Sequence, residues 1–256
     1  MYPILFRVGS FALSSYSVMV VIAFLVAYKL CEGEFKRKGL SASLLDLLLV
    51  ANVLGGILGA KILFLMENVP FSEFMANPAR YLSSGLTFLG GFLGALILIG
   101  VVVWIKKVKF WLAADAMAPA FVVGYAIARI GCFLVGDDYG TPSNLPWAMA
   151  FPIGSPPTNE RVHPTQIYEI LVMLGIFIYI WQIRKRNVPV GWLTSMVLIL
   201  TGAERFFVEF IRHTTPSFIP GISLAQLMSL GLIIAGVLKL VWTRVQERKL
   251  AEPVKA

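Results

Sequence analysis

Long apolar runs separated by short polar clusters dominate the 256-residue sequence. A helix needs about 20 apolar residues to cross the hydrocarbon core of a bilayer. Seven segments come close to this length: 13–31, 43–66, 86–105, 111–135, 164–183, 190–211 and 222–243. The fourth and sixth carry charged residues within the apolar run. The pattern predicts an all-α integral membrane protein of about seven transmembrane helices.

The composition also favours a membrane protein. Hydrophobic residues make up 58% of the sequence and the mean hydropathy is +0.79, whereas soluble domains are about 45–50% apolar. We attribute the net charge of +8 to basic cytoplasmic loops and expect no nucleic-acid partner. The sequence shows no internal repeat, and residues 1–256 are expected to form a single transmembrane domain.

Lysine and arginine residues predict the orientation of the helices. Most of the 22 basic residues fall in connections, helix ends and the C-terminal tail that an alternating topology places on one side of the membrane. They are Lys29, Lys36, Arg37, Lys38, Lys106, Lys107, Lys109, Arg184, Lys185, Arg186, Lys239, Arg244, Arg248, Lys249 and Lys255. Because cytoplasmic loops carry an excess of such residues, we expect the N-terminus outside and the C-terminus in the cytoplasm. The longest outer connection, 136–163, is expected to form a small periplasmic cap.

Polar side chains gather at the outer ends of six predicted helices. They are Tyr16, Lys61, Arg129, Asp137, Asp138, His163, Tyr168, Glu169, Glu204, Arg205, Glu209, Arg212 and Gln226. A charge inside the bilayer costs roughly 2.5–3.5 kcal/mol on insertion scales and marks function by default. Structural ion pairs are the alternative, since Arg205 and Glu209 are four residues apart on one helix face. For the whole set we favour a cationic pocket for a phospholipid phosphate, because arginine binds phosphate bidentately.

Motifs in these regions follow one another in a recognisable order. The main motif is ARIGCFLVGDDYG from Ala128 to Gly140, continuing through Pro142 to Leu145-Pro146-Trp147. Further motifs are Asp115 with Pro119, His163-Pro164-Thr165-Gln166 with Tyr168-Glu169, Arg205-Phe206 with Glu209-Phe210 and Arg212, and Gln226 followed by Ser229. Looser matches are Gly59-Ala60-Lys61 and Gly85-Leu86-Thr87-Phe88 with Gly90-Gly91. The ordered set spans nearly the whole chain and resembles the bacterial prolipoprotein diacylglyceryl transferases.

This resemblance implies a multi-pass enzyme of the bacterial plasma (inner) membrane whose active site faces the periplasm. Such an enzyme transfers diacylglyceryl from phosphatidylglycerol to the lipobox cysteine of a preprolipoprotein, forming a thioether and releasing glycerol phosphate. By position, Arg129 and Arg205 match the essential arginines of the family, Glu209 its acidic partner and Tyr16 its tyrosine. No cofactor and no metal are expected, and the partners are membrane lipid and the lipobox segment.

The chain departs from the family pattern at four positions. Leu89 stands where a histidine is common, and Cys132 where an asparagine is common. Asp137 replaces a frequent glutamate, and Lys61 a frequent arginine. Without the histidine, either the base lies elsewhere or the chain is a divergent branch with another activity.

Thiol attack on the glycerol carbon requires a thiolate and a stabilised phosphate leaving group. Arg129 and Arg205 are expected to stabilise the phosphate. His163 has the right reference pKa for a base, although we slightly favour the alternative of a loop histidine that caps the next helix before Pro164. For Asp137 the two roles are to accept a proton or to orient an arginine, of which we favour the second. We expect Glu209 to hold Arg205.

The remaining polar residues receive weaker assignments. Tyr16, Lys61, Tyr168, Glu169 and Gln226 are expected to bind substrate together with the arginines; Lys61 alternatively snorkels to the interface. Cys132 is expected to be a small apolar helix residue, because the reacting thiol comes from the substrate. Asp46 is expected to cap a helix, and the role of Asp115 stays open.

Two other functions compete with transfer. A lipid transporter or flippase would place charges near the midplane and show repeat symmetry. A non-catalytic lipid-binding homologue is the other alternative, motivated by Leu89.

Overall fold

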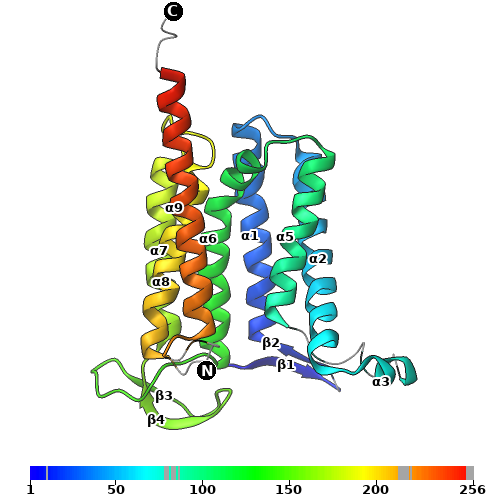
Figure 1. Ribbon diagram of the computed structural model, residues 1–256. Coiled ribbons are helices and arrows are strands. Elements are labelled where there is room, and N and C mark those ends of the chain that lie inside the picture. The colour runs from blue at the N-terminus through cyan, green and yellow to red at the C-terminus, as the bar shows by residue number, and fades with distance from the viewer. Residues whose placement is uncertain are drawn as a thin grey trace, which may run out of the picture. The chain divides into compact units, whose positions relative to one another are not determined.

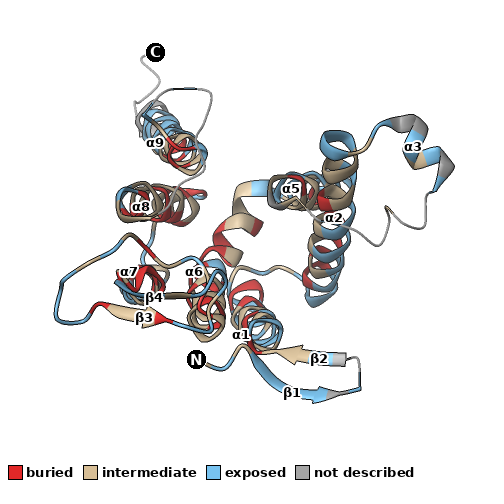
Figure 2. Ribbon diagram, turned by 90° about the horizontal axis from the view of Figure 1, so that it is seen from below, coloured by how far each residue is buried: buried red, intermediate tan, exposed pale blue. Residues whose placement is uncertain are grey.

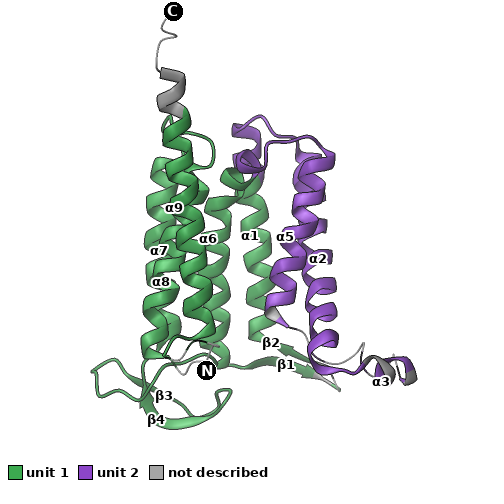
Figure 3. Cartoon of the chain, in the orientation of Figure 1, with its two compact units in different colours: residues 1–31, 114–256 green, residues 32–113 purple. Residues whose placement is uncertain are grey.

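The computed structural model describes residues 1–9, 11–77, 81, 85, 87–212, 219 and 221–251. These residues are mostly helical, and their contacts divide the chain into two compact units (Figure 3). Unit 1 comprises residues 1–31 and 114–256, and unit 2 comprises residues 32–113. The expected single domain over 1–256 therefore stays a prediction.

Unit 1 contains most of helices α1 and α6, all of α7, α8 and α9, and two short hairpins (Figure 1). The elements are β1 (Ile4–Val8), β2 (Phe11–Ser14), α1 (Ser15–Arg37), α6 (Phe110–Val135), β3 (Met149–Phe151), β4 (Thr158–Val162), α7 (Thr165–Ile183), α8 (Trp192–Val208), the 3₁₀ turn η1 (Glu209–Ile211) and α9 (Leu224–Ala251). A buried core joins α6, α7 and α8 (Figure 2). It consists of Ala118, Val122, Ala126, Met173, Ile176, Ile180, Leu193 and Val197.

Many large apolar side chains of the same helices remain exposed. Leu25 of α1, Leu171 of α7, Phe207 of α8 and Leu238 of α9 are each more than 60% exposed. Apolar surface of this extent on long helices is what a bilayer covers. The burial pattern therefore agrees with the composition.

Four helices in the described ranges are long and apolar enough to cross a membrane: Ala42–Asn68, Phe110–Val135, Thr165–Ile183 and Leu224–Gln246. Leu89–Ile105 is a shorter apolar helix. The expectation of a mainly helical membrane protein is confirmed to this extent. All seven predicted segments overlap a helix, namely α1, α2, α5, α6, α7, α8 or α9, while the count of seven spans stays a prediction.

The two hairpins lie outside the all-helical expectation. β1 pairs antiparallel with β2, and β3 with β4. Neither pair is visible in the sequence, because the strands have only three to five residues and show no clear alternation of polar and apolar positions. The second hairpin belongs to the segment 136–163, which was expected to form a cap.

The 136–163 segment is folded around a buried aromatic side chain. Phe151 is 1% exposed and stacks on Tyr139 with ring centroids 5.3 Å apart. The guanidinium group of Arg161 donates to the carbonyl oxygens of Leu145, Pro146 and Ala148. These bonds add to the backbone hydrogen bonds within the segment, such as those from Ser143 to Arg161 and from Ser155 to Gly136.

Unit 2 contains α2 (Ala42–Asn68), α3 (Phe71–Ala76) and α5 (Phe88–Ile105). Helices α2 and α5 approach so closely that their backbones touch at glycines. A Cβ atom added to Gly59 would lie 2.2 Å from the carbonyl oxygen of Gly90, and one added to Gly55 would lie 2.5 Å from that of Gly94. Small residues allow such close approach of membrane helices, and the glycines of α2 and α5 make this contact possible.

Candidate active site

Three arginines on separate segments of unit 1 meet at the carboxylate of Glu169 in α7. Glu169 is fully buried, with 0% of its surface exposed. Its Oε1 accepts hydrogen bonds from Nη1 of Arg205 at 3.2 Å and Nη1 of Arg212 at 3.1 Å. Its Oε2 forms an ion pair with Nε of Arg129. Arg129 of α6 and Arg205 of α8 therefore share one anion, while their predicted contact with a substrate phosphate stays a prediction.

Arg129 is held on several sides besides this ion pair. Its Nη1 donates to Oδ2 of Asp138 at 2.8 Å, and its Nη2 donates to the hydroxyl of Tyr125 at 3.1 Å. Nη1 also lies 3.5 Å from Sγ of Cys132. These contacts fix the plane of the guanidinium group, which makes its N–H groups a pre-organised set of donors.

Arg205 is linked to the start of α9 through a second series of contacts. Its Nη2 lies 3.0 Å from Oε2 of Glu209, so the ion pair predicted for these two residues is present. Oε1 of Glu209 accepts the hydroxyl of Ser223 at 3.0 Å. Ser223 and Gln226 cap α9 reciprocally: the backbone N–H of Ser223 donates to Oε1 of Gln226, and the backbone N–H of Gln226 donates to Oγ of Ser223. The substrate-binding role expected for Gln226 stays a prediction.

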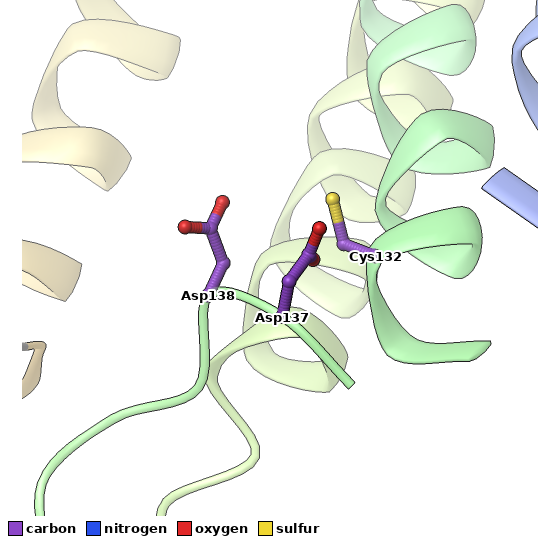
Figure 4. A group of neighbouring side chains, drawn as sticks. All are labelled: Cys132, Asp137 and Asp138. Atoms are coloured by element: carbon purple, nitrogen blue, oxygen red, sulfur yellow. The ribbon is translucent and has the colours of Figure 1, made fainter. Parts of the chain in front are cut away.

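Asp137 and Asp138 point in different directions where the chain leaves α6 (Figure 4). Gly136 and Asp138 both have positive φ angles, of 74° and 60°. This turn places the carboxylate of Asp137 beside the thiol of Cys132 and turns that of Asp138 away from it. Asp138, not Asp137, bridges Arg129 and Arg212, with Oδ1 2.6 Å from Nη2 of Arg212. The expectation that Asp137 orients an arginine is therefore corrected to its neighbour.

The two aspartates also differ in their pKa. Burial raises the pKa of Asp137 above its ordinary value of 3.8. Burial acts in the same direction on Asp138, but the positive charges of Arg212 and Arg129 outweigh it and lower its pKa. Asp138 is thus the stable anion between two guanidinium groups.

His163 lies at the edge of this cluster, before α7. Its Nδ1 is 3.3 Å from the hydroxyl of Tyr168, which accepts a hydrogen bond from Nε1 of Trp147 at 2.7 Å. The residue at the N-cap of α7 is Pro164, and no side-chain hydrogen bond caps this helix. The ring of His163 therefore does not cap α7, while its role as a base stays a prediction.

Tyr16 and Lys61 occupy different surroundings. The ring of Tyr16 lies near Gly131 of α6. Its hydroxyl group interacts electrostatically with Asp137, Arg129 and Asp138. Lys61 belongs to unit 2, where its Nζ donates to the carbonyl oxygens of Tyr81 at 3.3 Å and Gly85 at 2.8 Å. Its predicted contact with a substrate phosphate stays a prediction.

A pocket of about 430 Å³ opens beside the cluster in unit 1. Its lining consists of Arg212 and residues of the 136–163 segment, among them Asp137, Asp138 and Tyr139. The volume suits a small polar ligand or a lipid headgroup. Charged groups of the cluster therefore border a space that a ligand can enter.

The charges within the cluster are matched. The paired groups are Arg129, Arg205 and Arg212 on one side and Glu169, Glu209 and Asp138 on the other. The sequence predicted a cationic pocket, and the structure corrects this to a pocket of compensated arginines. The side chain of Arg205 is 26% exposed, against 12% for Arg129 and 8% for Arg212. Arg205 is consequently the most accessible of the three for an incoming phosphate.

Cys132, Asp137 and Asp138 are the residues of the described ranges whose ligand atoms lie close enough to hold a metal, within 4.8 Å of one another (Figure 4). Both carboxylate oxygens of Asp138 already face guanidinium groups. Two neighbouring positive charges repel a cation, so this group does not fit a metal centre.

Three residues of this region received no individual role from the sequence: Arg212, Asp138 and Glu204. Arg212 and Asp138 complete the ion pairs around Glu169, and Glu204 lies buried on α8. The available signal was their position among intramembrane charges. The pairing around Glu169 leaves no pattern in the sequence, because Arg129, Arg205 and Arg212 each lie 36 or more residues from it, as the separation of 36 between Glu169 and Arg205 shows.

Helices α6, α7 and α8 thus define a helical membrane protein with a buried, arginine-rich polar site at one end of its apolar core. The family model described as prolipoprotein diacylglyceryl transferase matches residues 3–242. The phosphatidylglycerol–prolipoprotein diacylglyceryl transferase of Polynucleobacter asymbioticus is 34% identical, with 92% of this chain and 93% of the relative covered. Those of Nitrosospira multiformis and Synechocystis are 32% and 27% identical and cover 94% and 98% of this chain. The chain belongs to the prolipoprotein diacylglyceryl transferase family.

Proposed function

We infer that this protein transfers the diacylglyceryl group of phosphatidylglycerol to the cysteine thiol of prolipoproteins. The observation that carries this inference is the convergence of Arg129, Arg205 and Arg212 on Glu169 beside a pocket of about 430 Å³. Arginine forks match the geometry of a phosphate diester. The names of the relatives support phosphatidylglycerol as the source of this phosphate and a prolipoprotein as the acceptor.

The reaction forms one bond and breaks one bond. The thiolate sulfur attacks the glycerol carbon of the diacylglyceryl group, and the bond from that carbon to the phosphate oxygen breaks. The leaving glycerol phosphate takes the electron pair, so negative charge grows on its oxygen atoms. Arg129 and Arg205 stabilise this charge, and Asp138 and Glu169 keep their guanidinium groups aligned.

The topology proposed for this activity has seven spans. Helices α1, α5 and α8 join the four long apolar helices, with the N-terminus outside and the C-terminus in the cytoplasm. The arginine site then faces the periplasm of the inner membrane, beneath the 136–163 cap. A lipobox segment reaches the site from the same leaflet that supplies the lipid.

Transfer is tested with the full-length protein in nanodiscs that contain either phosphatidylglycerol or phosphatidylethanolamine. A synthetic lipobox peptide with one cysteine is the acceptor, and mass spectrometry detects the diacylglyceryl thioether. We expect product and released glycerol phosphate only with phosphatidylglycerol. Arg129→Ala and Arg205→Ala should each lower the rate by about 10²–10³-fold, because each removes a donor to the leaving group.

Arg244→Ala is the matched control, since Arg244 lies exposed near the end of α9. This variant should keep the wild-type rate. Absence of thioether with the wild-type protein, or full activity of Arg129→Ala, would reject the proposal. Movement of labelled lipid between leaflets without thioether would support a flippase instead.

A further inference from the structure

Glu204 is a buried carboxylate that the ion-pair cluster does not use. It is 6% exposed, and among the described residues neither Oε1 nor Oε2 has a hydrogen-bond partner. Glu169, Glu209 and Asp138, by contrast, are each paired with an arginine. Burying a polar group without a hydrogen bond is energetically unfavourable. Such an uncompensated group inside a membrane domain marks a functional site.

The position of Glu204 follows from the helical period of α8. Val197 belongs to the core between α6, α7 and α8, and Glu204 lies seven residues further along the same face. Thr201 and Val208 continue this buried stripe. Glu204 therefore faces the interior of unit 1 at the level of the arginines and is not turned toward lipid.

Charged and titratable groups from each helix of this core act on Glu204. They are Tyr125 and Arg129 of α6, Glu169 of α7, Arg205 of α8 and Arg212 after η1. The same arginines are the groups proposed to stabilise the leaving phosphate. A proton acceptor beside them is close to the atoms that must exchange a proton during transfer.

We propose that Glu204 is the general base that removes the proton from the acceptor thiol. This inference rests on the proposed transferase function. The S–H proton passes to an Oε atom of Glu204 as the sulfur–carbon bond forms and the carbon–oxygen bond to phosphate breaks. The protonated carboxyl group then returns the proton to the released phosphate or to water, which restores the carboxylate. Either of the two oxygens without a partner can accept the S–H proton of the thiol.

The test compares Glu204→Gln with the wild-type protein at several pH values. Glutamine keeps the size of the side chain but cannot accept the proton. We expect the transfer rate at neutral pH to fall by on the order of 10²–10⁴-fold, the usual contribution of a general base. The residual rate should rise about tenfold per pH unit toward the thiol pKa of about 8.5, since only ionised thiol reacts. Glu204→Asp, which keeps a carboxylate, should recover part of the rate.

A peptide with selenocysteine in place of cysteine separates a base from a structural residue. The selenol is already ionised at neutral pH and needs no base. Glu204→Gln should therefore lose about tenfold or less with the selenocysteine peptide, while Arg129→Ala loses activity with both peptides. Glu32→Gln, an exposed glutamate near the end of α1, should match the wild type with both.

Each outcome decides between the alternatives. Equal losses with the two peptides, or an unchanged pH profile, would overturn the assignment to Glu204. The same holds if Glu204→Gln keeps the wild-type rate, in which case His163→Gln should show the pH behaviour described. An unfolding midpoint of Glu204→Gln close to that of the wild type shows that the loss is chemical. If the wild-type protein forms no thioether at all, the proposed function fails before the role of Glu204 is reached.

Discussion

Helices α2 and α5 of unit 2 meet through glycines, whereas helices α6, α7 and α8 of unit 1 meet around charged side chains. At the glycine contact, the carbonyl oxygen of Gly90 occupies the place where Gly59 would carry a Cβ. At the charged contact, Glu169 forms ion pairs with three guanidinium groups, and Glu169 itself has no exposed surface. Close packing of small residues stabilises helix pairs in lipid, while buried ion pairs add little net stability. Buried charges, which cost free energy and add little stability, are therefore expected at the site of the reaction.

The largest effect is expected from Glu169→Gln in unit 1. This change removes the anion shared by Arg129, Arg205 and Arg212, and breaking a buried pair costs about 3–5 kcal/mol. The free energy of unfolding in detergent should fall by that amount, and the transfer rate should fall by about 10²–10³-fold because the arginines lose their alignment. Glu32→Gln serves as the exposed control. A stable and fully active Glu169→Gln protein would show that the ion pairs of unit 1 are needed neither for stability nor for transfer.

Gly59→Ala tests the packing contact of unit 2. The new methyl group would lie 2.2 Å from the carbonyl oxygen of Gly90, so α2 and α5 must separate at a cost of about 1–3 kcal/mol. Gly56→Ala on the same helix has no atom within 4 Å of its new Cβ. It should keep or slightly raise the unfolding midpoint, since alanine favours helix more than glycine does. Equal midpoints for the two variants would contradict the close contact.

The same substitution at one helix start in each unit sharpens the comparison. Ser41 caps α2 by accepting the N–H of Leu44 at 3.2 Å, and Ser223 caps α9 while donating to Glu209. Loss of either cap should lower the free energy of unfolding by about 1 kcal/mol. Ser223→Ala should also lower the transfer rate, because Glu209 holds Arg205; Ser41→Ala should not. Unfolding midpoints and initial rates measured on the same preparations check both statements.

The smallest effects are expected from the aspartates at the end of α6, which are partly exposed to solvent. Because the pKa of Asp138 is lowered from 3.8, its stabilising contribution is complete above that pH and is lost as the pH falls through the lowered pKa. Asp138→Asn should unfold at a lower temperature than the wild type at pH 7. Its unfolding temperature should also change less than that of the wild type as the pH falls toward 3.

Asp137 should show the opposite sign. Its raised pKa means that stability is lost as the pH rises from 3.8 through the raised value. Asp137→Asn should therefore unfold at the same or a higher temperature at pH 7. Thermal unfolding from pH 3 to pH 8 compares the two variants directly, and identical curves would show that the two carboxylates are equivalent.

The sequence alone predicted the helices, and it predicted that Arg129, Glu169 and Arg205 lie at the same end of α6, α7 and α8. Both follow from the local pattern of apolar and charged residues along the chain. Apolar length gives the spans, and the helical period places Arg205 and Glu209 on one face. The glycines of α2 and α5 were also predictable, since small residues in apolar helices indicate close contact. The motif order of the chain predicted its family.

Other features depend on groups that are distant along the chain. The hairpins β1–β2 and β3–β4 are too short to leave a pattern. Asp115 caps the start of α8 by accepting the backbone N–H groups of Gly191 and Thr194, a role that its position in α6 does not show. The exchange of Asp137 for Asp138 as the arginine partner follows from the backbone turn at Gly136 and Asp138, whose φ angles are positive.

The sequence by itself determined that this is a helical membrane protein with arginines and carboxylates concentrated at one end of its predicted spans. Only the tertiary structure decided which charge neutralises which, and that Glu204 is left without a partner while Glu169 serves three arginines. The physical reason is that hydrophobic length is a local property of the chain. Electrostatic pairing over a few ångströms depends instead on how α6, α7 and α8 pack.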